Sequence, residues 1–586
     1  MQHMKSSILY LKSTFSIILS LITVFGISVS LPSDAQSPFQ RILPRSFLWV
    51  IIFFLLCIGS NILHKKTDSE QKRRAFFTAL FYSICNALGY FFKHWGIITE
   101  IWETNTELLN FICFLLGFLN LAYHFVLLLF FVLTNNQKRT GNIDSPKHHY
   151  IFYFVIFLLL AWLPWIAYNL PGIITIDSND HLSQAIGTSE LYDHHPILHT
   201  LWIKFLYFIC GNSQNTVMLY SIIQLLFSAL TFSYCLYCIQ KWFRIKKITF
   251  ISFLFFALYP VFPIYGMTMW KDIPFALVLL LISINICKLV RAKESKQKAL
   301  LFRNILLFSL LSLLRHNGIF IFIPVIIVFL FKYKAHRKFL SLAGFTAIAV
   351  FILFQTIGLS MLNVKKGRTS EGMSIPLQQI ARVVTNHGSE LTDSQKSRID
   401  YFFYGQDLSK IYKATLSDPV KKSFNEDHFK ADPTQFLSLW VELGLKHPID
   451  FIESVLHNSY GYWYPEANQK TFFFGLYFGE RFNLHQIQLY KSYFMQSLQG
   501  ALENMKYYSF PIISWLFSPA IAVWILFFAF QNCRLHKSDL WLVHVPLICL
   551  WLQMFGSPAF CEFRYVYGLF TSLPIILCCS FLSFQS

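Results

Sequence analysis

The sequence predicts an all-α polytopic membrane protein with about 14 transmembrane helices. Of its 586 residues, 55% are hydrophobic and only 13% are charged, whereas a soluble domain usually carries about a quarter charged residues. Apolar runs of roughly 20 residues, the length that crosses a bilayer, recur along nearly the whole chain. The formal net charge of +19 is concentrated in short loops, where it orients helices, so no nucleic-acid partner is expected.

The expected spanning segments are taken in chain order. The first, 8–31, follows Lys5 and Lys12 and is either a signal peptide or an uncleaved helix, and its length favours the helix. Two shorter apolar segments, 303–314 and 318–331, are expected to form a hairpin around Arg315-His316-Asn317. The remaining segments are 46–63, 76–98, 108–133, 150–170, 216–240, 248–269, 273–290, 339–362, 509–530, 540–557 and 565–583.

The loop charges predict the orientation of these helices. The segments 64–75, 137–148, 241–247, 288–303, 332–338 and 531–538 hold most of the loop lysines and arginines, and the alternate loops hold few. The positive-inside rule therefore assigns the first set and both termini to the cytoplasm. It assigns the long polar region 363–508 to the outside, where Asp432-Pro433 and His447-Pro448 indicate helix starts in a helical extracytoplasmic domain.

The outer loop 171–200 is the first candidate site. It contains Asp177, Asp180, Asp193, His194 and His195, and no lysine or arginine. Acids beside a bilayer are poorly solvated, which raises their pKa and suits a general base. Two acids and two histidines in so short a stretch leave room for a divalent cation or a proton relay, although their spacing matches no standard zinc pattern. The alternative is a polar loop in which Asp180 caps a helix at 181–187.

Two further polar groups interrupt apolar sequence on the same predicted side of the membrane. Lys271-Asp272 either forms a local salt bridge or belongs to a site. Arg315 and Asn317 lie at the hairpin tip, where the arginine either reaches a lipid phosphate or snorkels to the headgroups. In the outer domain, Gln379 and Arg382 fall at helical spacing. They either bind substrate or belong to a solvated helix face.

These residues resemble the GT-C class of integral-membrane glycosyltransferases, which includes the protein O-mannosyltransferases and the aminoarabinose transferases of lipid A. If a module begins at 150–170, Asp177 matches the catalytic acid of the first outer loop. Asp272 in KDIPF then matches the second acid, at the head of the fourth helix. The segments PGIITIDSND, HHPILHT, KDIPF, LLRHNG, IPLQQIARVV and YWYP are also similar to an uncharacterised family of bacterial polytopic membrane proteins in that class.

The resemblance divides the chain into four parts. These are an N-terminal four-helix membrane extension (1–148), a GT-C-like catalytic membrane module (149–362), the extracytoplasmic helical domain (363–508) and C-terminal membrane helices (509–586). It implies a glycosyltransferase that moves a sugar from a polyprenyl-phosphate carrier to an acceptor hydroxyl on an envelope glycan, lipid or protein. The cytoplasmic loops are too short for a nucleotide-binding domain, which agrees with a lipid-linked donor.

Each candidate residue has an expected role in such a reaction. Asp177 and Asp272 are the expected catalytic residues, and the substrate-binding candidates are Asp180, His194, His195, Lys271, Arg315, Asn317, Gln379 and Arg382. The expected site lies outside the cytoplasmic membrane, and no cofactor beyond a divalent cation is implied. The alternative function is a polytopic transporter or lipid flippase, for which ionisable residues on broken helices near mid-bilayer are expected.

Overall fold

The computed structural model describes residues 16–26, 28, 46–94, 96, 105–136, 146–467, 469–487, 489 and 492–581. Within these ranges the chain is helical and contains isolated β-bridges but no strand. The ends of the predicted first segment and the loop residues 32–45, 99–104 and 137–145 lie outside the described residues.

The described helices are long and apolar enough for a multi-pass membrane protein. Nine have the length and hydropathy to cross a bilayer, or ten if one bent pair counts as a span. The prediction of about 14 spans stays a prediction. Four shorter apolar helices accompany them, at Ser16–Gly26, Ile197–Cys210, His316–Lys332 and Pro519–Leu535.

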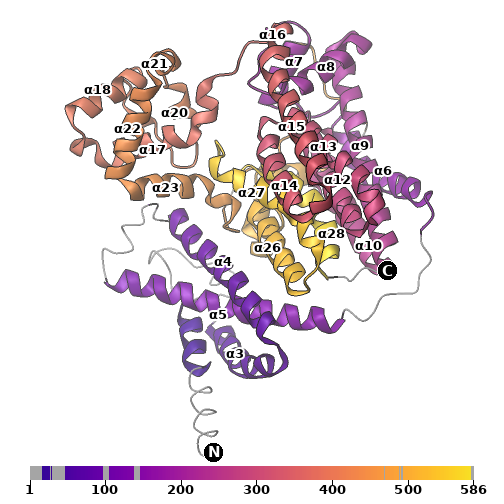
Figure 1. The fold of residues 1–586 in the computed structure, drawn as a ribbon, viewed down its shortest axis with the longest axis vertical. Coiled ribbons are helices and arrows are strands. Elements are labelled where there is room, and N and C mark those ends of the chain that lie inside the picture. Colours follow the sequence, from indigo (N-terminus) through magenta and orange to yellow (C-terminus); the bar gives the residue numbers. More distant parts are fainter. Residues whose placement is uncertain are drawn as a thin grey trace, which may run out of the picture.

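The first described helices form a separate group, in the lower left of Figure 1. They are the short helix Ser16–Gly26, α3 (Ser46–Lys66), α4 (Ser69–His94) and α5 (Asn105–Asn136). Helix α4 packs along α5 and also against α26 (Pro519–Leu535) near the other end of the chain. This contact joins the N-terminal helices to the central bundle.

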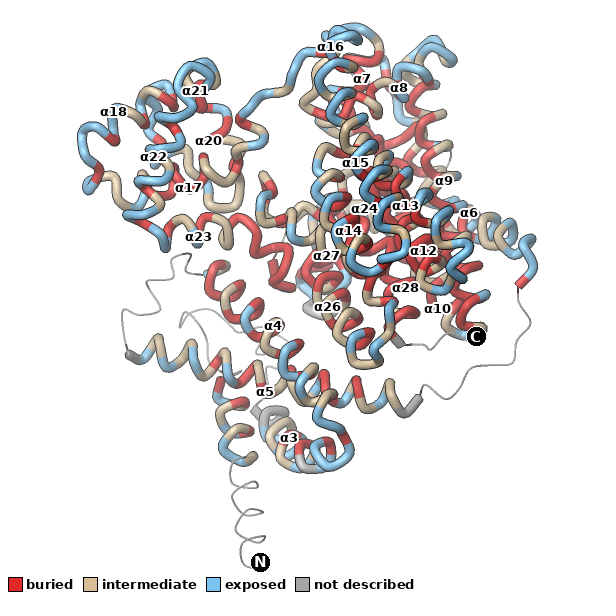
Figure 2. Tube along the Cα trace, in the orientation of Figure 1, coloured by how far each residue is buried: buried red, intermediate tan, exposed pale blue. Residues whose placement is uncertain are grey.

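The central bundle carries most of the spanning helices. Its elements are α6 (Tyr150–Tyr168), α7 (Ile176–Ala185), α8 (Ile197–Cys210), α9 (Ser213–Phe243), α10 (Lys246–Leu258), α11 (Val261–Met267), α12 (Asp272–Arg291), α13 (Glu294–Leu314), α14 (Ile319–Lys332), α15 (Arg337–Leu353) and α16 (Leu359–Met361), with short turns η2 (His316–Gly318), η3 (Lys334–His336) and η4 (Phe354–Gly358). Helix α12 lies at its centre, packed by α9, α13 and α28, and is buried along most of its length (Figure 2). Helices α6 and α15 are apolar yet largely exposed, as expected of helices that face lipid.

The C-terminal elements complete this bundle. They are η7 (Tyr460–Tyr462), η8 (Gly479–Phe482), α24 (Tyr493–Glu503), η9 (Lys506–Ser509), α25 (Pro511–Leu516), α26, η10 (Asp539–His544), α27 (Val545–Leu552), η11 (Gln553–Gly556), η12 (Phe563–Val566) and α28 (Tyr567–Phe581). Helix α28 packs against both α12 and α26, so the last span lies directly beside the central helix.

Two of the predicted continuous segments are interrupted at prolines. The segment 248–269 divides into α10 and α11, which meet at an angle of 49° next to Pro260. The segment 509–530 divides into α25 and α26 at Ser518-Pro519. Proline has no backbone N–H and its ring clashes with the preceding turn, so a helix is kinked or restarted there.

A compact unit of short helices stands beside the bundle, at the upper left of Figure 1. We call residues 374–446 the lateral unit; it comprises α17 (Ser374–His387), η6 (Gly388–Glu390), α18 (Asp393–Phe402), α19 (Leu408–Ile411), α20 (Asp418–Lys422), α21 (Glu426–Ala431) and α22 (Pro433–Lys446). The turn η5 (Thr369–Met373) precedes it and α23 (Pro448–Ser459) follows it. The unit has its own hydrophobic core, whereas residues from Tyr460 onward share the core of the bundle. The predicted helix starts at Pro433 and Pro448 are confirmed.

Candidate functional site

A cavity of about 800 Å³ lies where the bundle, the linker before the lateral unit and α20 meet. Its wall contains seven of the ten candidate residues predicted from the sequence. These are Asp177, Asp180, His194, His195, Lys271, Arg315 and Asn317. The other lining residues come from 355–372, 418–422 and 553–565, so six regions of the chain converge on one polar space.

The first turn of α7 fixes Asp177 at this cavity. Thr175 is the N-cap of α7 and forms a capping box with Ser178. The Ser178 hydroxyl donates to the carbonyl of Met269 at 2.8 Å, which ties α7 to the segment that leads into Lys271. Because this capping box begins the helix before Asp180, the alternative in which Asp180 caps a helix at 181–187 is wrong.

The Asp177 carboxylate is surrounded by positive charge. Its Oδ2 atom accepts a hydrogen bond from Arg564 Nη1 at 2.6 Å and lies 3.6 Å from Lys271 Nζ. Burial works against its ionisation, but the charges of Arg564 and Lys271 outweigh it and hold the pKa of Asp177 well below its usual value. The expectation of a raised pKa is therefore wrong for Asp177.

The other two aspartates of the loop, Asp180 and Asp193, have the expected raised pKa. Burial raises the pKa of Asp193 to about 6, and its Oδ1 lies 3.5 Å from His316 Nε2. Burial and the nearby charge of Asp177 raise the pKa of Asp180. Neither acid has a cation as close as those beside Asp177, so desolvation dominates.

His195 stands between Lys271 and Asp177. Lys271 Nζ donates to His195 Nδ1 at 2.9 Å, and His195 Nε2 lies 4.0 Å from Asp177 Oδ2. Burial and the charge of Lys271 keep the pKa of His195 well below its usual value, so the ring is neutral near pH 7. The neighbouring His194 lies 3.9 Å from Glu371 and stacks on Tyr192.

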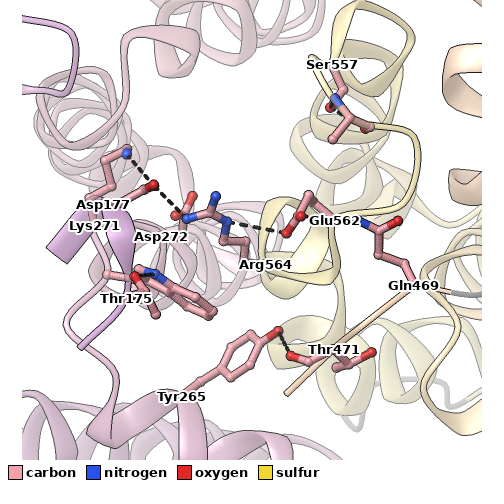
Figure 3. A network of polar contacts seen from close by, with 12 residues as sticks. Thr175, Asp177, Tyr265, Lys271, Asp272, Gln469, Thr471, Ser557, Glu562 and Arg564 are labelled. Carbon is pink, nitrogen blue, oxygen red and sulfur yellow. Dashed lines mark hydrogen bonds and ion pairs between the residues drawn. The ribbon is translucent and has the colours of Figure 1, made fainter. Parts of the chain in front are cut away.

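Arg564 connects the acidic loop to the last span, and the sequence interpretation did not assign it a role. It lies between Asp177 and Glu562 (Figure 3), with its Nε 3.5 Å from Glu562. Its guanidinium group covers the rings of Trp270 and Tyr565, at 5.0 and 5.3 Å from their centres. The available signal was the Glu-Phe-Arg sequence at the head of a strongly apolar C-terminal segment.

Asp272 opens the central helix α12 and pairs with Arg315. It is 1% exposed, and its Oδ1 lies 3.0 Å from Arg315 Nη1. The Arg315 guanidinium covers the rings of Phe275 and Tyr565. The alternative of a local salt bridge between Lys271 and Asp272 is therefore wrong. Lys271 pairs with Asp177, and Asp272 pairs with Arg315.

Gln379 and Arg382 do not reach the cavity. Both lie on α17 and are buried. Gln379 donates to the Phe451 carbonyl at 3.1 Å, and Arg382 pairs with Glu453. The alternative of a solvated helix face is wrong, and these contacts hold α17 against α23.

A divalent cation at the acidic loop stays a prediction. In the described part of the chain, one group of three His, Cys, Asp or Glu side chains brings its ligand atoms within 4.8 Å of one another. That group lies at the edge of the lateral unit, away from the loop residues 171–200.

Comparison with known proteins identifies a family. Residues 181–585 match a family described as Family of unknown function (DUF6020). The matched region includes Lys271, Asp272, Arg315 and Arg564, and it begins after Asp177. No curated protein and no solved structure matches the chain.

Proposed function

This chain belongs to the Family of unknown function (DUF6020), and we propose that it is a membrane glycosyltransferase of the GT-C type. It takes a sugar from a polyprenyl-phosphate carrier and passes it to an acceptor hydroxyl of an envelope glycan, lipid or protein. The reaction takes place outside the cytoplasmic membrane, in the cavity around Asp177.

The convergence of one ionised carboxylate with three sheltered cations carries this proposal. Lys271, Arg315 and Arg564 line the cavity beside Asp177, and their side chains are each 15% exposed or less. Sheltered cations stabilise phosphate oxygens more strongly than exposed ones, because water screens them less. A volume of about 800 Å³ falls in the range of ligand pockets, which suits a sugar and its phosphate.

The proposed step is a single displacement. The acceptor oxygen forms a bond to the anomeric carbon, and the bond from that carbon to the phosphate oxygen breaks. The electron pair of the broken bond leaves with the polyprenyl phosphate, whose charge Lys271 and Arg564 stabilise. The proton of the acceptor hydroxyl passes to Asp177.

The low pKa of Asp177 gives this step a dependence on the donor. In the free protein, Arg564 and Lys271 hold the carboxylate ionised, which makes it a weak base. A bound phosphate shares the charge of the same two cations, so the Coulomb attraction that lowers the pKa of Asp177 weakens. Asp177 therefore becomes a better base when the donor is in place.

The remaining candidates fall into two groups. Asp180, His194, His195 and Asn317 line the cavity and are proposed to contact the sugar and the acceptor. Asp272 is buried behind Arg315, so it acts through that side chain as a positioning residue. The charged groups stand at helix ends, since Asp272 begins α12 and Arg315 follows α13. This arrangement favours a transferase over a transporter with ionisable groups at mid-bilayer.

The test compares the envelope polymers and lipids of cells that have and lack this protein. We expect loss of one sugar substituent in the deletion strain and its return with the wild-type gene. Asp177→Asn should insert and accumulate normally but fail to restore the substituent. Asp427→Asn is the matched control, because that side chain is 89% exposed on the lateral unit. Unchanged glycans in the deletion strain, or full restoration by Asp177→Asn, would refute the proposal.

A further inference from the structure

A group of histidines and acids lies at the edge of the lateral unit, outside the site described above. His387 ends α17. His447 joins α22 to α23, and Asp450 lies in the first turn of α23. One ligand atom from each of these three side chains lies within 4.8 Å of the other two. Two segments separated by most of the lateral unit therefore meet at this corner.

The separation of the facing atoms suits a metal ion. His387 Nε2 lies 3.0 Å from Asp450 Oδ2. Zinc binds histidine nitrogen and carboxylate oxygen at about 2.0–2.2 Å in tetrahedral geometry, which separates neighbouring ligand atoms by about 3.3 Å. The pair thus needs only a small outward shift to hold one ion between its two atoms.

An unpartnered nitrogen gives a second, independent indication. His447 is 8% exposed, and its buried Nε2 atom has no hydrogen-bond partner. The rings of His447 and His387 lie nearly parallel, with centres 4.2 Å apart. Leaving a buried polar nitrogen unpaired costs about 1–3 kcal/mol. A cation bound between the rings and Asp450 would satisfy this nitrogen.

The surrounding contacts orient the three side chains as metal ligands are usually oriented. His387 Nδ1 lies 3.1 Å from Glu390 Oε1, so Nε2 is the ring nitrogen that faces Asp450. Asn386 donates to Asp450 Oδ1 at 2.7 Å, and Arg382 Nε also lies near Oδ1, at 3.5 Å. Oδ2 is then left to face His387. A carboxylate behind a ligating histidine, and a hydrogen bond to a ligating carboxylate, are common features of metal sites.

We propose that His387, His447 and Asp450 bind one zinc-class divalent metal ion, with water as the fourth ligand. His387 is 30% exposed, so the ion enters from solvent on that side. Bound metal joins the end of α17 to the α22–α23 corner. Helix α23 packs against η11, whose residues Gln553 and Met554 line the large cavity. Metal binding therefore stiffens the connection between the lateral unit and the bundle.

The test measures metal binding by the full-length protein, purified in detergent without a histidine tag and stripped with a chelator. We expect one equivalent of Zn²⁺ in competition with a chromogenic chelator. Co²⁺ should give the visible absorption of a tetrahedral complex. Zn²⁺ should also raise the midpoint of thermal unfolding. Failure of the wild-type protein to bind near one equivalent would overturn the proposal, independently of any variant.

Variants identify the ligands. His387→Ala and His447→Ala should weaken Zn²⁺ binding by at least a hundredfold, and Glu390→Gln by about tenfold because it orients His387. His485→Ala removes an exposed histidine elsewhere and should bind as the wild type does. His387 is half-buried, so its variant is expected to fold even if His447→Ala does not. Unchanged binding by His387→Ala would refute the assignment.

Discussion

Replacing Arg315 by methionine tests the pairing at the head of α12. The change removes the cation 3.0 Å from Asp272 and leaves a carboxylate that is 1% exposed. Neither oxygen of Asp272 has a hydrogen-bond partner, so little remains to stabilise the charge. Breaking a buried ion pair on one side costs about 3–5 kcal/mol. The lost contacts with the rings of Phe275 and Tyr565 add about 1 kcal/mol. We expect the free energy of unfolding to fall by about 5 kcal/mol.

The assay is denaturant unfolding of the full-length protein in detergent, followed by tryptophan fluorescence. Arg303→Met is the matched control, because Arg303 lies on α13, the helix that Arg315 follows, and is exposed. It should change stability by less than about 1 kcal/mol. The double variant Asp272→Leu/Arg315→Met removes both charges and should recover most of the loss. The reasoning is refuted if Arg315→Met costs no more than Arg303→Met, or if the double variant is less stable than Arg315→Met alone.

Three further predictions concern the cavity and the segment that leads into Lys271. Arg564→Gln removes the closest cation from Asp177, so the pKa of Asp177 should rise. Carbodiimide labelling of Asp177 near pH 6 should then increase. Unchanged labelling would contradict the pairing of Asp177 with Arg564. Burial raises the pKa of Asp193 to about 6, so the native state holds a proton that the unfolded state releases near pH 4, and stability falls as the pH rises toward 6. After allowance for solvent screening, we expect the free energy of unfolding to fall by about 1–2 kcal/mol between pH 4.5 and 7 in the wild type, and not to fall in Asp193→Asn. An unchanged pH profile of unfolding in the variant would refute the idea. Gln224 donates to three backbone carbonyls at the C-terminal end of α11, so Gln224→Leu should cost about 2–3 kcal/mol in denaturant unfolding. A loss below about 0.5 kcal/mol, the scatter of surface substitutions, would count against those bonds.

Sequence patterns identified seven of the residues that line the cavity, but not which of them pair with one another. Lys271, Asp272 and Arg315 were identifiable because charged side chains rarely interrupt apolar segments without a function. Asp177 stood out in a loop of acids without lysine or arginine. Gln379 and Arg382 were identified by their helical spacing, yet their partners are Phe451 in α23 and Gly96 after α4. Helical spacing gives the face of a helix that a residue occupies, and it does not give what packs against that face.

Arg564 shows why the pKa of Asp177 could not be predicted without the tertiary structure. Its partner Asp177 is 387 positions away in the chain, and no local pattern relates the two. A carboxyl beside a bilayer is expected to have a raised pKa from desolvation alone. The cation supplied by the last span reverses that expectation for Asp177, while Asp193, without such a cation, retains it.

The sequence by itself determined that this is a helical protein of the membrane. Transfer of an apolar segment from water to lipid depends on its own length and composition, and both can be counted along the chain. Only the tertiary structure decided which acid meets which cation, and hence which carboxyl stays ionised. The charge state of a sheltered group depends on distances of a few ångströms between segments that folding brings together, because Coulomb energy falls with separation and burial weakens the screening by water.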